Sequence, residues 1–129
     1  MIVVDASVIV ELLTSTGRRT SLQERLAHEH LAAPDILPIE VASALRGLGR
    51  GGHLDDATIS STAEDLARLP LDLHPSLPLV PGVLALRENL SAYDASYVAL
   101  AAALGCSLLT YDRRLVRAAG AHCAVELAP

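Results

Sequence analysis

Five short apolar runs alternate with longer stretches of helical pattern, and this alternation constrains the fold more than any other feature of the sequence. The runs are built mainly from valine, isoleucine, leucine and alanine, as buried strands are, and they occupy residues 2–4, 31–33, 71–73, 107–110 and 124–127. Strands that alternate with helices form right-handed crossovers and a mostly parallel sheet with helices on both faces. The sequence therefore predicts an α/β fold.

Capping signals place the helices between these runs. We expect helices over residues 8–13, 20–29, from Asp35 to the glycine-rich stretch at 47–52, and over 55–68, 82–88, 91–104 and 112–119. Ser7 is a good N-cap for the first helix, and Asp35 caps the third. Residues 91–94 have the spacing of a capping box, and Gly105 stands where a C-terminal cap belongs.

Length and composition indicate one compact unit. The chain has 129 residues, of which 51% are hydrophobic and 19% charged, so it can bury one core without disulfides. We expect a single domain over residues 1–129. The longest weakly polar run, 95–109, is shorter than the roughly 20 residues that a membrane helix needs, and no signal-like segment precedes Asp5. These features predict a cytoplasmic protein with no membrane association.

The charges exclude a general basic surface for nucleic-acid binding. The net charge is −5 and every basic side chain apart from histidine is an arginine. Arg113 and Arg114 are adjacent, which suits bidentate contact with phosphate. Two interpretations stay open for this pair: an RNA-contacting patch, or arginines on a solvated helix face.

Cysteine and histidine give no sign of a zinc site. Cys106 and Cys123 lie in apolar stretches with no further ligand at metal-binding spacing, and none of the five histidines has such spacing. We therefore expect the two cysteines to be buried free thiols.

Four acidic residues follow strands or begin helices: Asp5, Glu40, Asp94 and Asp112. Ligands bind beyond the carboxyl ends of parallel strands, so these four side chains are expected to converge at one edge of the sheet. Each also has an ordinary structural explanation. Asp94 and Asp112 suit helix caps, and Glu40 suits a solvated helix surface. Asp5 is harder to explain in this way, because it ends a buried strand and the chain has no lysine to pair with it.

A cluster of carboxylates requires a cation. Two carboxylates about 4 Å apart repel each other by roughly 4 kcal/mol at an effective dielectric constant near 20. Arginine is one source of positive charge, but oxygen ligands of this kind suit Mg²⁺ or Mn²⁺, which keep open positions for water and phosphate. The chemistry that this arrangement favours is metal-assisted phosphodiester hydrolysis.

The local patterns around the four acids resemble those of PIN-domain ribonucleases, the toxins of VapBC-type (type II) toxin–antitoxin pairs. The matching segments span nearly the whole chain and are Ile-Val-Val-Asp5-Ala-Ser7, Pro38-Ile-Glu40-Val-Ala-Ser-Ala-Leu45, Leu90-Ser-Ala-Tyr-Asp94-Ala-Ser-Tyr-Val-Ala-Leu100 and Leu109-Thr110-Tyr-Asp112-Arg-Arg-Leu115. The resemblance implies a three-layer α/β/α fold, Mg²⁺ or Mn²⁺ at the acidic pocket and cleavage of RNA. It also implies a homodimer and a cognate VapB-type antitoxin that blocks the site.

The same resemblance assigns roles to the acids and to two hydroxyls. Asp5, Glu40 and Asp94 would hold the principal metal ion, and Asp112 would position a second ion or the attacking water. Ser7 and Thr110 match positions whose hydroxyls hydrogen-bond the acids or a metal-bound water. Their simpler interpretations, as a helix cap and a strand-end residue, stay open.

This chain departs from some relatives just after Asp112. Where they carry a further acid, Arg113, Arg114 and Leu115 follow here. The departure leaves open whether one or two metal ions bind, and it favours contact between the arginines and the RNA backbone.

Rival functions fit less well. A haloacid-dehalogenase-like phosphatase needs a second Asp at position 7 and a lysine, and a phosphoacceptor receiver domain needs the same missing lysine. A non-catalytic PIN-like module that binds a basic peptide or a structural ion stays open as the alternative. The leucines that are candidates for antitoxin contact or for ordinary core packing are Leu22, Leu26, Leu45 and Leu48.

Overall fold

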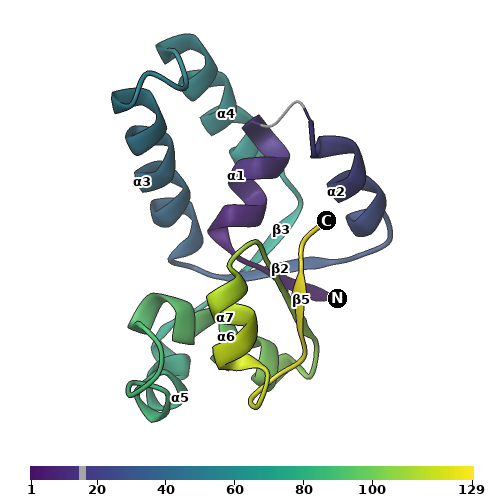
Figure 1. Cartoon of the computed structure of the whole chain (residues 1–129), viewed down its shortest axis with the longest axis vertical. Helices are drawn as coiled ribbons and strands as arrows, with labels where there is room; N and C mark the ends of the chain where they lie inside the picture. The colour runs from purple at the N-terminus through teal and green to yellow at the C-terminus, as the bar shows by residue number, and fades with distance from the viewer. Residues whose placement is uncertain (15–16) are drawn as a thin grey trace.

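The computed structural model describes residues 1–14 and 17–129, and its centre is a sheet in which every pair of neighbouring strands is parallel (Figure 1). The strands are β1 (Ile2–Val4), β2 (Leu31–Pro34), β3 (Leu71–His74), β4 (Ser107–Thr110) and β5 (Val125–Leu127). Their order across the sheet is β3-β2-β1-β4-β5. Each strand lies within about one residue of the run that predicts it, so the expected α/β class is confirmed.

Two layers of helices enclose the sheet (Figure 1). One side carries α1 (Ala6–Thr14), α2 (Arg19–Leu26), α3 (Leu37–Arg50) and α4 (Asp56–Arg68). The other side carries α5 (Val80–Ala85), α6 (Ala92–Leu104) and α7 (Arg113–Ala119), with a short 3-10 turn, η1 (Leu77–Leu79), before α5. Right-handed crossovers produce this division, because the chain moves outward from β1 through β2 to β3 and then returns to β4 on the other side of β1.

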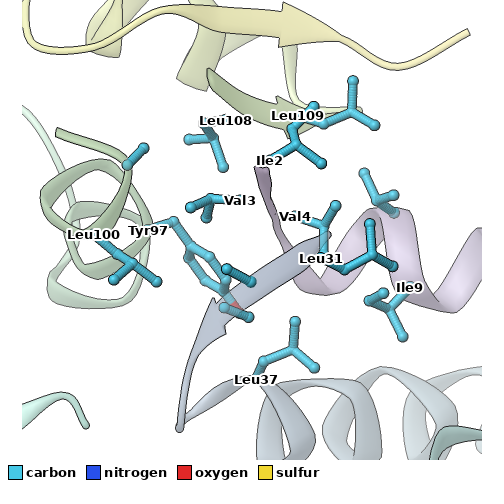
Figure 2. Close-up of a cluster of buried hydrophobic side chains, with 14 of the residues drawn as sticks. Ile2, Val3, Val4, Ile9, Leu31, Leu37, Tyr97, Leu100, Leu108 and Leu109 are labelled. Atoms are coloured by element: carbon cyan, nitrogen blue, oxygen red, sulfur yellow. The ribbon is translucent and has the colours of Figure 1, made fainter. Parts of the chain in front are cut away.

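The core lies on both faces of β1 and its two neighbours. All three residues of β1 are buried, and so are Leu108 and Leu109 on β4. Figure 2 shows these side chains together with Ile9, Leu31 and Leu37, and with Tyr97 reaching into the cluster from α6. Full burial of such an aliphatic side chain contributes about 1.5–3 kcal/mol, so the central strands hold the carboxyl edge of the sheet rigidly in place.

The first helix begins two residues earlier than the sequence predicts, and Ser7 is not its cap. The backbone N–H of Val8 donates to Oδ1 of Asp5 at 3.2 Å, and the N–H of Ile9 donates to the Asp5 carbonyl at 3.3 Å. Asp5 is therefore the N-cap, which it can be because its short carboxylate accepts from the third residue of the helix. Ser7 lies in the first turn instead.

The third helix also differs from its prediction at both ends. Asp35 does not cap it; its carboxylate accepts from the backbone N–H of Ser76 at 3.2 Å and so joins the segments that follow β2 and β3. The helix continues through Gly47 to Arg50 because α4 lies close against it. A Cβ placed on Gly49 would come within 2.6 Å of Cδ1 of Ile59, so glycine permits this approach.

Other signals in the sequence are confirmed. The Ser91 hydroxyl accepts from the N–H of Asp94 at 3.1 Å, and Gly105 ends α6 in the left-handed conformation with φ 63°. Cys106 and Cys123 are free, but each is only half-buried. No helix in the described ranges is long and apolar enough to span a membrane.

Candidate active site

Asp5 stands at the point where the strand order reverses. It follows β1 directly, and β1 lies between β2, which continues the outward path, and β4, where the chain returns. In open parallel sheets the crevice at this switch point is where ligands bind. The backbone N–H of Asp5 still donates to the Leu109 carbonyl of β4 at 3.3 Å, so the side chain is carried on the rigid end of the sheet.

Three donors hold the carboxylate of Asp5. Oδ1 accepts from the Ser7 hydroxyl at 2.5 Å and from the Val8 N–H, while Oδ2 accepts from the Thr110 hydroxyl. The side chain is 9% exposed. Burial raises the pKa of Asp5, and the nearby charge of Asp94 raises it further, although the three hydrogen bonds oppose the shift. The carboxylate is thus fixed in place but costly to ionise without a cation.

The two hydroxyls also join Asp5 to the segment after β4. Ser7 Oγ accepts from the N–H of Tyr111 at 3.2 Å, and Thr110 Oγ1 accepts from the N–H of Asp112 at 2.9 Å. Each hydroxyl therefore donates to Asp5 and accepts from the backbone. This hydroxyl bridge places Asp5 and Asp112 at one edge.

Glu40 lies in the first turn of α3 and is half-buried. Its Oε1 accepts from the phenol of Tyr97 at 2.8 Å. Burial raises the pKa of Glu40, the Tyr97 hydrogen bond lowers it, and the charges of Asp94 and Asp5 raise it again. Burial and Glu40 raise the pKa of Tyr97 well above its usual value, so this phenol stays protonated and acts as a donor.

Asp94 and Asp112 each stand at a helix start. Burial raises the pKa of Asp94, the hydrogen bond with Ser91 lowers it, and the charge of Asp112 raises it. Asp112 is the N-cap of α7, because its Oδ1 accepts from the N–H groups of Arg114 at 2.8 Å and Leu115 at 3.3 Å. The capping interpretation of Asp112 therefore holds for one carboxylate oxygen, which leaves Oδ2 for other contacts.

The negative charges of the four acids act on one another. The charge of Asp94 raises the pKa of both Asp5 and Glu40, and the charge of Asp112 raises the pKa of Asp94. Apart from Arg18, no arginine within residues 1–14 and 17–129 forms an ion pair with any of the four. The arrangement concentrates negative charge at the switch point.

The donor set suits a hard divalent cation, although it is not a complete ligand cage. Among the described residues, no three Asp, Glu, His or Cys side chains are gathered closely enough to hold an ion by themselves. Mg²⁺ commonly binds through only one or two carboxylates and keeps several waters. Carboxylate oxygen ligands fit an ion of this kind better than they fit zinc.

A groove of about 740 Å³ lies beside these acids between α1 and α3. Ser7, Glu40 and Leu48 are among the residues that line it. Arg18 and Tyr111 also line it, with the guanidinium 5.4 Å from the centre of the ring. The groove gives an elongated ligand access to Glu40.

Sequence reasoning did not single out Tyr97, Arg18 or Tyr111. Tyr97 had one available signal, since it lies three residues after Asp94 and so shares its helix face. Arg18 and Tyr111 meet only through the fold. The predicted arginine pair, Arg113 and Arg114, is exposed in the first turn of α7 beside Asp112.

Fold and site together define a class of protein. It is a parallel α/β protein with a carboxylate-rich site, suited to a divalent cation, at the switch point of its sheet. The family model for the PIN domain matches residues 2–121, and the chain belongs to the PIN-domain family. The resemblance seen in the sequence motifs is thereby confirmed.

Individual relatives agree with this assignment. The chain is 40% identical over 129 residues to the ribonuclease VapC9 of Mycobacterium tuberculosis H37Rv, covering 100% of this chain and 99% of the relative. It has the fold of VapBC2 from Rickettsia felis, solved bound to a promoter DNA fragment, with a TM-score of 0.73, 15% identity and full coverage of both chains. A toxin–antitoxin complex from Klebsiella pneumoniae has the same fold, with a TM-score of 0.64, 18% identity and 90% coverage of each chain.

Proposed function

We propose that this protein is a metal-dependent endoribonuclease that hydrolyses RNA phosphodiester bonds and acts as the toxin of a VapBC-type toxin–antitoxin pair. The observation that carries the proposal is that Ser7 and Thr110 hold the buried carboxylate of Asp5 at the switch point beside Asp112, and the charges of the neighbouring acids add to the effect of burial on the pKa values of Asp5, Glu40 and Asp94. The similarity to a VapC ribonuclease over the whole chain supports it.

The cofactor is Mg²⁺ or Mn²⁺. Asp5, Glu40 and Asp94 hold the principal ion directly or through water. Asp112 completes the pocket with Oδ2, because its Oδ1 accepts the hydrogen bonds of the helix cap. A bound ion of this type supplies a water of lowered pKa and neutralises charge on the phosphate. The protein itself fixes Asp5 through Ser7 and Thr110, and it presents Arg113 and Arg114 to the RNA backbone.

The antitoxin partner supplies an apolar helix and a basic group. The groove between α1 and α3 suits such a segment, because apolar residues such as Leu48 line it together with the acid Glu40. Of the other leucines considered for this contact, Leu22, Leu26 and Leu45 are buried in the core and serve packing instead. The toxin–antitoxin complex of the same fold supports an antitoxin partner.

A homodimer is the proposed assembly. Large apolar side chains are exposed on the segment that contains η1 and α5: Leu77 is 81%, Val80 43% and Leu84 54% exposed. An apolar surface of this kind is typical of a subunit interface. The dimer would align two acidic pockets along one groove.

The decisive experiment incubates purified, antitoxin-free protein with total bacterial RNA in Mg²⁺, in Mn²⁺ and in EDTA. The wild type is compared with Asp5→Asn and with the matched control Asp72→Asn, which changes an exposed acid on β3. We expect discrete, metal-dependent cleavage by the wild type and the control, and none by Asp5→Asn. Identical cleavage by all three would place the activity elsewhere, and metal binding without cleavage would favour a non-catalytic PIN-like binding module.

A further inference from the structure

Tyr97 is the largest of the fully buried side chains in the described chain, and its only polar atom points at the acidic site. The residue is 1% exposed, yet its phenol donates to Oε1 of Glu40 at 2.8 Å. A buried hydroxyl needs a partner, but many neutral partners would satisfy it. The Tyr97 hydroxyl instead donates to the carboxylate of Glu40 in the candidate active site, and this partner requires an explanation.

The contact joins opposite sides of the molecule. Tyr97 belongs to α6, whereas Glu40 belongs to α3 in the other helix layer (Figure 1). Figure 2 shows the ring crossing the core beside the strands, with its oxygen at the far end. Helix α6 packs against β1, β2 and β4. Tyr97 therefore fixes Glu40 relative to α6 and the central strands.

We infer that Tyr97 is a positioning residue for Glu40, holding Oε1 so that Oε2 faces the acidic pocket as a pre-oriented metal ligand. This inference rests on the proposed metal-dependent ribonuclease. Glutamate has three rotatable side-chain bonds, and a half-buried one is otherwise free to turn toward water. A hydrogen bond from a rigid, buried ring removes that freedom.

A tyrosine suits this role better than a basic residue does. A neutral phenol orients the carboxylate without cancelling the negative charge that attracts a cation, whereas an arginine would cancel it. Tyr97 also lies one helical turn after Asp94, so α6 supplies one acid and the support for another. Partners that orient metal ligands in this way commonly change metal affinity or activity by about 10- to 100-fold when they are removed.

The experiment uses Tyr97→Phe, which keeps the ring and removes only the hydroxyl. Mn²⁺ binding to the full chain is measured by isothermal titration calorimetry without RNA, and kcat and KM are measured on a cleaved RNA. We expect Mn²⁺ affinity to fall about 10-fold and kcat to fall with it, while KM for RNA changes less than about twofold.

Thr62→Val is the matched control for structural damage. Thr62 is equally buried and its hydroxyl donates to the Thr58 carbonyl at 2.7 Å, inside α4 and away from the acids. This variant should lose stability but keep Mn²⁺ affinity. Equal Mn²⁺ affinity in wild type and Tyr97→Phe would overturn the inference, and so would an equal loss in Thr62→Val.

A second comparison tests whether Tyr97 acts through Glu40. In a Glu40→Gln background, Tyr97→Phe should change Mn²⁺ affinity by less than about twofold, because the ligand that it positions is already lost. A further 10-fold loss in that background would contradict the inference. If the wild type itself neither binds Mn²⁺ nor cleaves RNA, the proposed function fails and this role falls with it.

Discussion

The hydroxyl of Thr110 donates to Oδ2 of Asp5, although the two residues are 105 positions apart in the sequence. They meet because β4 returns directly beside β1, so the ends of the two strands stand side by side. Thr110 also accepts from the N–H of Asp112. One fully buried hydroxyl thus connects two of the four acids and determines how Asp5 is held.

Removing this hydroxyl should destabilise the protein. In Thr110→Val the buried Oδ2 of Asp5 loses its donor, so we expect the free energy of unfolding to fall by about 1–3 kcal/mol. Urea denaturation in EDTA at neutral pH measures the change. Ser61→Ala removes an exposed hydroxyl and should change stability by less than about 0.5 kcal/mol. A Thr110→Val protein as stable as this control would refute the prediction.

Metal-free stability should depend on pH through the site acids. The pKa values of Asp5, Glu40 and Asp94 are raised above 3.8, 4.5 and 3.8, mainly by burial. Between the unfolded-state and folded-state pKa values of these acids, the folded protein binds more protons than the unfolded chain. The contribution of the protonated acids to stability is therefore complete at pH values below the unfolded-state pKa values, and it is lost as pH rises through the folded-state pKa values.

The test compares wild type with Asp5→Asn in EDTA by urea denaturation across this range. The stability of the wild type relative to the variant should fall as pH rises from about 4 toward neutrality. Saturating Mn²⁺ at neutral pH should restore stability to the wild type alone. A stability difference that stays constant with pH would argue against an unneutralised acidic cluster.

Two glycines of α3 should respond differently to alanine. A methyl group added at Gly47 would meet nothing within 4 Å, so Gly47→Ala should stabilise the helix by about 1 kcal/mol. Gly49→Ala should gain less, because its methyl group meets Cδ1 of Ile59 at 2.6 Å. Ile59→Val removes that atom, so Gly49→Ala should recover the missing gain in this background. Thermal unfolding of Gly47→Ala, Gly49→Ala, Ile59→Val and the Gly49→Ala/Ile59→Val double variant measures these effects. If the effects of Gly49→Ala and Ile59→Val on stability are additive, the predicted contact between the two positions is wrong.

Arg113 and Arg114 should contribute to RNA affinity rather than to metal binding. We expect the double alanine variant, made in an Asp5→Asn background to prevent cleavage, to bind RNA more weakly. For single-stranded RNA, each phosphate contact that is lost should reduce the slope of the logarithm of the binding constant against the logarithm of the salt concentration by about 0.7. Replacement of the exposed Arg68 and Arg87 provides a charge-matched control. Equal RNA affinity before and after the Arg113 and Arg114 change would refute the role, as would an equal loss in the control.

The exposed apolar segment should determine the oligomeric state. Leu84→Glu places a charge on the surface of α5 and should convert a dimer to a monomer, as measured by light scattering after size-exclusion chromatography. Leu127→Glu on β5, at the opposite edge of the sheet from β3, should leave the dimer intact. A dimer that survives Leu84→Glu would place the interface elsewhere.

The strands could be predicted from the sequence because each is a short apolar run bounded by polar or turn residues. Helix starts were less certain, since neighbouring residues compete for the same capping role. Asp5 and Ser7 are both good caps, and only the structure shows that Asp5 caps while Ser7 supports it. The end of α3 was missed because close packing against Ile59, not local preference, accounts for Gly49.

The order of the four acids is visible in the sequence, but their supports are not. Thr110 and Ser7 adjoin predicted elements and could be proposed from their position. Tyr97 could not be linked to Glu40, because 57 residues and the full thickness of the sheet separate their helices. The assignment of Asp5, Glu40, Asp94 and Asp112 to metal binding stays a prediction until binding is measured.

Because all five strands run in one direction, the four acids follow their carboxyl ends, and the segments that lead into the strands lie at the opposite end of the sheet. The turn between α7 and β5 belongs to that opposite end, and Ala121 and His122 within it are exposed. A fluorophore or affinity tag inserted there would stand about a strand's length, roughly 10 Å, from the acids. The turn between α7 and β5 is therefore a suitable place to attach a label or a surface linker, because the acidic site stays accessible.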